Sequence, residues 1–95
     1  MSIENHPPYL LIKLFHDFTM DKLGLHYFLF LFVEDKERKA LLLLPYMLKF
    51  YGDKLDEKYN VLREYYGGFC EIHDNSCDME IIKIIKEITK LKKNF

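Results

Sequence analysis

The first part of the chain carries apolar residues at the spacing of one helix face. The members of this stripe are Leu10, Leu11, Leu14, Phe15 and Phe18. Steps of three and four residues predict an amphipathic helix. Proline is tolerated in the first helical turn, and glycine commonly follows the last turn. The pattern therefore predicts a helix from about Pro8 to Leu23, ending at Gly24.

The next segment, LHYFLFLFV (25–33), is apolar at nearly every position and shows no helical amphipathicity. Aromatic and β-branched residues in a short run are typical of a strand. The charged stretch EDKERK (34–39) follows as a turn, and the apolar run ALLLL (40–44) follows that turn. The two runs together predict an antiparallel hairpin.

A longer stripe begins where the second predicted strand ends. Pro45 ends that strand and can begin a helix. Apolar positions then keep a step of three or four residues at Leu44, Leu48, Tyr51, Leu55, Tyr59, Leu62 and Tyr66. Gly52 lies off the stripe and predicts a kink, with Asp53 capping the second half. Gly67 and Gly68 close this helix.

The last third of the chain predicts a short third strand, FCEIHD (69–74), and a final helix from about Cys77 to Lys93. The predicted order is α-β-β-α-β-α. Ninety-five residues suit one domain, because a second would lack a core of its own. We therefore expect a single α+β domain over residues 1–95, with an antiparallel hairpin and a short third strand packed with three helices.

The predicted first strand carries apolar side chains on both faces. Phe28, Phe30 and Phe32 share one face, and leucine, tyrosine and valine residues occupy the other. Burying one phenylalanine contributes about 1.5–3 kcal/mol, so exposing three forfeits several kcal/mol. We therefore expect self-association as a homodimer through this sheet face. The alternative is a monomer whose helices cover both faces.

The final helix offers a second apolar surface and a basic one. Its apolar stripe is Ile81, Ile84, Ile88 and Leu91, which suits either a partner helix or the protein's own sheet. Its opposite face carries Lys83, Lys86, Lys90 and Lys93. This ridge suits a phosphate backbone, or else is a solvated face that complements the helix dipole. The formal net charge of −1 gives no overall field that favours nucleic acid.

The stretch GGFCEIHDNSC (67–77) contains both cysteines of the chain. Cys70, His73 and Cys77 have the residue types and local spacing of zinc ligands, with His6, His16 or His26 as possible fourth ligands. A disulfide between Cys70 and Cys77 is a second possibility, and two ordinary buried thiols are a third. The simplest interpretation is a connector between a strand and a helix, without metal.

The sequence contains no recognised catalytic or phosphate-binding motif, so we expect a non-enzymatic protein without a cofactor. The start MSIENHPPY does not resemble a secretory signal, and the longest apolar run is too short for a membrane span. We therefore expect a cytoplasmic protein that does not bind membranes. The predicted function is a small interaction or accessory domain that forms homodimers and binds an unidentified protein partner. The alternative is a nucleic-acid-binding regulatory protein that uses the lysine ridge.

Overall fold

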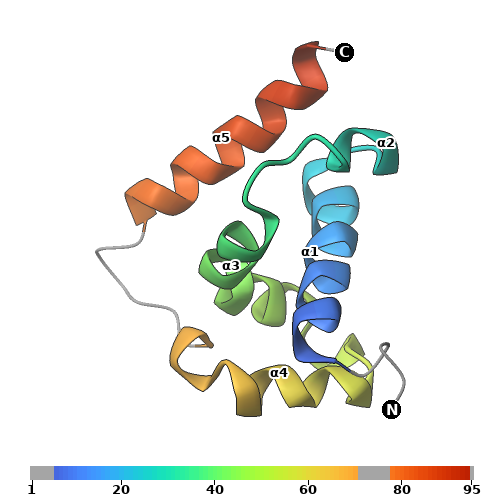
Figure 1. Ribbon diagram of the computed structural model, residues 1–95, viewed down its shortest axis with the longest axis vertical. Helices are drawn as coiled ribbons and strands as arrows, with labels where there is room; N and C mark the ends of the chain where they lie inside the picture. The colour runs from blue at the N-terminus through green and yellow to red at the C-terminus, as the bar shows by residue number, and fades with distance from the viewer. Residues whose placement is uncertain (1–5, 71–77, 95) are drawn as a thin grey trace.

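The computed structural model describes residues 6–70 and 78–94, and every regular element in these ranges is helical (Figure 1). In chain order the elements are α1 (Pro7–Leu23), α2 (Tyr27–Phe30), α3 (Lys36–Tyr51), the short 3-10 helices η2 (Gly52–Lys54) and η3 (Glu57–Tyr59), α4 (Asn60–Tyr65), η4 (Gly67–Phe69) and α5 (Asp78–Asn94). The predicted α+β class is wrong, because no strand occurs among the described residues. Within them there is neither a hairpin nor a sheet face.

α1 confirms the predicted first helix. Pro7 and Pro8 lie in its first turn, where the missing N–H groups cost little because those amides have no partner inside a helix. Gly24 ends the helix with a φ of 66° and donates its backbone N–H to the carbonyl of Thr19. Only glycine adopts this left-handed conformation without a steric cost. The chain therefore changes direction at the predicted residue.

Residues 25–33 form the four-residue helix α2 and a turn, not the predicted strand. Their backbone bonds are local: Phe30 N–H donates to His26 O at 3.1 Å, and Val33 N–H donates to Phe30 O at 3.1 Å. A segment that is apolar throughout satisfies the helical period as well as the strand period. The buried members confirm this helical spacing, being Leu25, Leu29, Phe30 and Val33.

The second predicted strand, residues 40–44, is the middle of α3. The helix runs through Pro45, although proline removes one hydrogen bond inside a helix and costs about 3 kcal/mol there. Burial offsets this cost, because α3 contributes a continuous buried stripe. That stripe consists of Ala40, Leu43, Leu44, Pro45, Met47 and Leu48. Pro45 is therefore an interior residue of one helix and not the boundary between two elements.

α3 ends at Tyr51, whereas the sequence predicted one helix that continues through a kink at Gly52. Gly52 has a φ of 53° and a ψ of −127°, a conformation that favours glycine. Gly52 begins η2, and η3 and α4 come next, so the predicted single helix up to Tyr66 is wrong beyond Tyr51. Asp53 lies inside η2, whose N-cap residue is Tyr51, so the predicted cap at Asp53 is wrong. The broken path carries α4 across the end of the molecule opposite to α2 (Figure 1).

The third predicted strand is also wrong where it is described. Phe69 lies in η4 and Cys70 in the bend that follows, while residues 71–74 lie outside the described residues. The predicted last helix is confirmed by α5. α1 and α5 have 17 residues each. Neither these nor the other helices in the described ranges have the length and hydrophobicity that a membrane span requires.

α1 and α3 pack side by side, with α4 across one end and α5 along the flank near the other end (Figure 1). Tyr51 of α3 donates to Asp21 Oδ2 of α1 at 2.7 Å, and burial, with this bond, raises the pKa of Tyr51 above its usual range. α5 is joined to α3 by the ion pairs Arg38–Glu80 and Lys39–Glu87. The core they enclose includes Leu11, Phe15, Leu43, Met47, Leu62, Ile84 and Ile88.

Candidate functional site

The residues predicted to form an interface divide into a buried group and an exposed group. Phe30 is only 5% exposed, and the α5 residues Ile81, Ile84 and Ile88 are buried as well. Leu91 is partly buried against the same core. Phe28 and Phe32, in contrast, are 59% and 51% exposed. The buried side chains already serve the core, so within this set only the two outer phenylalanines present a large apolar surface.

Two neighbours that the sequence analysis did not select complete this exposed surface. Tyr27 is 61% exposed and Leu31 is 58% exposed. We call Tyr27, Phe28, Leu31 and Phe32 the aromatic corner, because they lie where α2 projects beside the end of α1 (Figure 1). The signal was present in the sequence. Residues 27–33 contain no charged side chain, so any helical turn they form must turn apolar groups outward.

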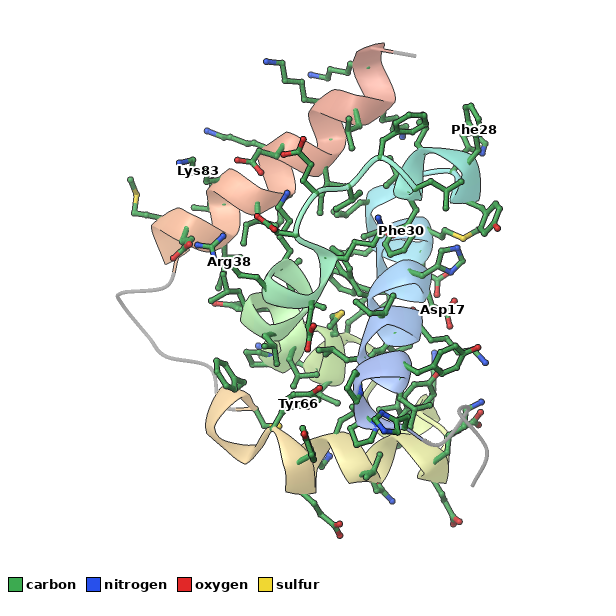
Figure 2. All side chains as sticks on the ribbon, viewed as in Figure 1. Asp17, Phe28, Phe30, Arg38, Tyr66 and Lys83 are labelled. Atoms are coloured by element: carbon green, nitrogen blue, oxygen red, sulfur yellow. The ribbon has the colours of Figure 1, made fainter. Side chains whose placement is uncertain are left out.

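Buried residues on the inner side of α2 fix the aromatic corner in place. The Phe30 ring packs edge-on against the Phe15 ring at 5.4 Å and the His16 ring at 5.0 Å, measured between centroids. Figure 2 shows Phe28 pointing away from the body of the molecule, while Phe30 lies over α1. This packing gives the exposed side chains a defined support. The backbone that carries the corner is therefore fixed by packing against α1.

The exposed rings are also ordered relative to one another. Phe28 and Phe32 meet edge-to-face with centroids 5.9 Å apart, and Tyr27 contacts the His16 ring at 5.5 Å. Taking about 200 Å² for each large side chain when fully exposed, roughly 450 Å² of the corner is open to solvent. The largest apolar patch on a monomer is typically about 300–600 Å² and is often functional. The aromatic corner has the size of such a patch.

Charged residues border the aromatic corner on two sides. Glu34 and Asp35 follow it directly and are exposed. Lys92 of α5 lies beside Tyr27 and Phe28, and its Nζ comes within 2.9 Å of the position that a Cβ on Gly24 would occupy. Lys36 Nζ donates to Val33 O at 2.9 Å, which ties the end of the turn to α3. One edge of the corner is thus acidic and the other basic.

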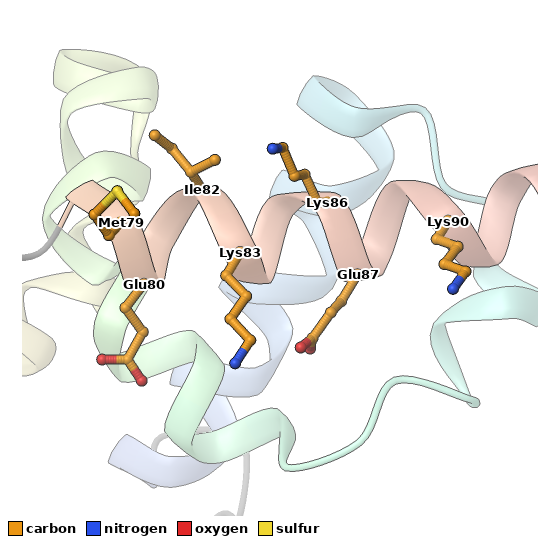
Figure 3. Close-up of a pocket in the computed structure, with 7 residues that line it drawn as sticks. All are labelled: Met79, Glu80, Ile82, Lys83, Lys86, Glu87 and Lys90. Carbon is orange, nitrogen blue, oxygen red and sulfur yellow. The ribbon is translucent and has the colours of Figure 1, made fainter.

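The lysine ridge lies on the outer face of α5. Figure 3 shows Lys83 and Lys90 along one edge of this face and Lys86 along the other. A shallow hollow there has a volume of about 850 Å³, but all of its lining residues come from α5, so it is an open surface and not a cavity. The two glutamates of this face, Glu80 and Glu87, pair with α3. Their negative charges are therefore partly neutralised, and the exposed charge is mostly positive.

The cysteine–histidine stretch gives no site that the structure can test. Cys70 Sγ lies 3.4 Å from Tyr66 O and 3.8 Å from Leu62 O, which places its thiol against the end of α4. His73 and Cys77 lie outside the described residues. Within residues 6–70 and 78–94, no group of three His, Cys, Asp or Glu side chains is placed to hold a metal ion. The metal and disulfide hypotheses therefore stay predictions.

The chain was compared with models of known families, with curated proteins and with solved structures, and none of them matches it. Its function must therefore be inferred from its own surface.

Proposed function

We propose that the protein is a small non-enzymatic interaction domain that self-associates through the aromatic corner. The observation that carries the proposal is the half-exposure of Tyr27, Phe28, Leu31 and Phe32 on a turn whose other side chains anchor it in the core. Large apolar side chains gathered in one place and rimmed by charges are typical of protein interaction sites. The proposal replaces the sheet face of the sequence analysis with a helical corner.

The expected association is weak to moderate. Burying the exposed half of four large side chains contributes about 4–6 kcal/mol per subunit. Association itself costs about 4–15 kcal/mol in lost freedom of motion. The corner also supplies only about half of the 800 Å² per partner that a standard interface buries. Two subunits together contribute about 8–12 kcal/mol, and the smallest association cost leaves about −8 kcal/mol, so a dissociation constant of about 1 μM is the tightest expected.

Sedimentation velocity over a concentration series tests this proposal. The wild-type chain should shift from monomer to a larger species, and the double variant Phe28→Asp with Phe32→Asp should remain monomeric. Tyr65→Asp is the matched control, because Tyr65 is 64% exposed on α4, away from the corner. It should associate like the wild type. A wild-type chain that stays monomeric at several hundred micromolar would overturn the proposal.

The lysine ridge supports nucleic-acid binding as a second candidate function. In the part of the chain that the structure describes, the ridge residues Lys83, Lys86, Lys90 and Lys93 form no ion pair, while the neighbouring glutamates pair with α3. Four such cations along one helix suit a phosphate backbone. Fluorescence anisotropy with duplex and single-stranded DNA should then give binding that weakens steeply with salt.

Lys86→Glu with Lys90→Glu should abolish this binding. Lys54→Glu with Lys58→Glu is the matched control, because both lysines are exposed and lie near α4 instead. No binding at low salt, or equal loss in the two double variants, would remove this second candidate.

A further inference from the structure

A second apolar surface of the molecule is concave. A groove of about 670 Å³ lies between the second halves of α1 and α3 and the first half of α5. Its floor includes Phe18, Leu43 and Ile81, which are buried. Phe50 and Ile82 form its exposed rim, with exposures of 43% and 47%. The volume lies within the roughly 300–1,000 Å³ of pockets that enclose drug-sized molecules, so it has room for two aromatic rings.

The charges that line this groove have one sign. Lys22 and Lys49 stand at its edges, and no carboxylate occurs among those lining residues that belong to the described ranges. Lys22 Nζ lies 5.7 Å from the centroid of the Phe50 ring, which places this cation directly beside the apolar rim. An occupant that suits the groove therefore combines large apolar groups with an acidic edge.

We propose that the groove receives the aromatic corner of a second copy of this chain. The corner offers the paired rings of Phe28 and Phe32, and the acidic residues Glu34 and Asp35 directly follow them. With the rings in the groove, these carboxylates face Lys22 and Lys49. This inference rests on the self-association proposed above and specifies which surface the corner contacts.

The contact joins two different surfaces of the chain, the corner of one copy and the groove of the other. If the rotation between subunits is twofold, two such contacts form at once, and each subunit buries both its corner and its groove. The combined area then approaches that of a standard interface, which the corner alone does not reach. If the rotation is not twofold, the contact repeats and subunits add head to tail.

Complementation between two defective variants tests the docking. The corner variant is Phe28→Asp with Phe32→Asp, and the groove variant is Ile82→Asp with Lys49→Glu. All four replaced side chains are exposed, and circular dichroism checks that both variants fold. Each variant alone should be monomeric at concentrations where the wild type associates. An equimolar mixture should form 1:1 heterodimers, because it still contains one intact corner and one intact groove. In the twofold case this heterodimer keeps one of the two contacts and binds more weakly than the wild type, whereas in the head-to-tail case the single contact has the wild-type affinity.

The outcomes separate this docking from the proposed self-association. If the groove variant associates as tightly as the wild type while the corner variant is monomeric, the docking is wrong and the self-association stands. If the mixture of the two monomeric variants stays monomeric even at several hundred micromolar, where a single corner–groove contact should still form, the docking is also wrong. A monomeric wild type, or a corner variant that associates like the wild type, overturns both. Sedimentation of the mixture, with one variant fluorescently labelled, reports all of these results.

A charge exchange gives a second test that leaves the core untouched. Lys22→Glu with Lys49→Glu should weaken association about 5-fold, and Glu34→Lys with Asp35→Lys should do the same, because exposed ion pairs contribute modestly. Mixing these two variants should restore wild-type affinity, since the exchanged charges pair again. A mixture that binds no more tightly than either variant alone would overturn the docking.

Discussion

α5 and the aromatic corner are both rich in apolar residues, yet they use them in opposite ways. α5 places Ile81, Ile84 and Ile88 in the core and keeps its lysines outside. The segment that carries the corner, residues 27–33, buries Phe30 but leaves Phe28 and Phe32 more than half exposed. The difference is the arrangement of polar residues. α5 has lysines at helical spacing to face water, whereas residues 27–33 contain none, so folding cannot hide all of their apolar surface.

The largest expected effect on stability distinguishes the buried side chain of α2 from an exposed one. Phe30→Ala should lower the free energy of unfolding by about 3–5 kcal/mol, because it removes a buried ring and leaves a cavity. Phe28→Ala should change monomer stability by less than about 1 kcal/mol, since that ring is mostly solvated. Urea denaturation of both variants at low protein concentration measures the contrast. Equal losses would show that the corner is an ordinary part of the core.

The same contrast should appear on α5. Ile88→Ala removes a side chain that is 1% exposed and should cost about 2–5 kcal/mol. Ile82→Ala removes one that is 47% exposed and should cost well under about 1 kcal/mol. Thermal melts of the two variants, with far-UV circular dichroism as the signal, give the comparison. A larger loss for Ile82→Ala would contradict the orientation of the helix.

Gly24 joins the two regions, because it starts the turn into α2 and because Lys92 Nζ of α5 lies 2.9 Å from the position that a Cβ on Gly24 would occupy. Gly24→Ala should destabilise the fold by about 1–2 kcal/mol, because a φ of 66° is costly for a residue with a Cβ. Gly67→Ala is the matched control, since a Cβ there meets nothing within 4 Å. Chemical denaturation should show little change for the control, and the two results coinciding would refute the strained turn.

The smallest expected effect on stability comes from Tyr51, which lies outside both α5 and the aromatic corner. Burial and the bond to Asp21 raise the pKa of Tyr51, whereas the unfolded chain loses this proton near about pH 10. The contribution of the Tyr51 hydroxyl to the free energy of unfolding is thus complete below about pH 10 and is lost as pH rises further. Tyr51→Phe should cost about 1 kcal/mol at pH 7 and lose less stability than the wild type between pH 9 and 11. Parallel losses in the two proteins would contradict this assignment.

The sequence predicted those elements whose apolar and polar residues separate cleanly. α1 and α5 were predicted almost to their ends, since each has one apolar stripe and α1 also has proline and glycine at its ends. Residues 25–33 and 40–44 were assigned to strands because long apolar runs fit either period, and only tertiary packing decides between them. Pro45 reinforced the error, because the burial that lets it remain inside a helix is not visible locally.

The candidate site was predicted in part. Phe28 and Phe32 were selected for an excess of apolar surface, and the structure leaves both more than half exposed, but on a helical turn and not on a strand; their role in an interface stays a prediction. Tyr27 and Leu31 were assigned to the opposite face, because a strand alternates its side chains whereas a helical turn brings these four residues outward together. The groove was not foreseen, because its walls come from three helices far apart in sequence.

Pro45 divides α3 into two halves that serve different surfaces. Lys36 and Lys39 in the first half hold α2 and α5, whereas Tyr46, Lys49 and Phe50 in the second half form a wall of the groove. Because proline has no amide hydrogen, the carbonyl of Leu41 lacks its helical donor, and the ladder is weakest there. Amide hydrogen exchange should consequently be faster in residues 46–51 than in 39–44, so that the groove wall can open locally while the base of the corner stays closed.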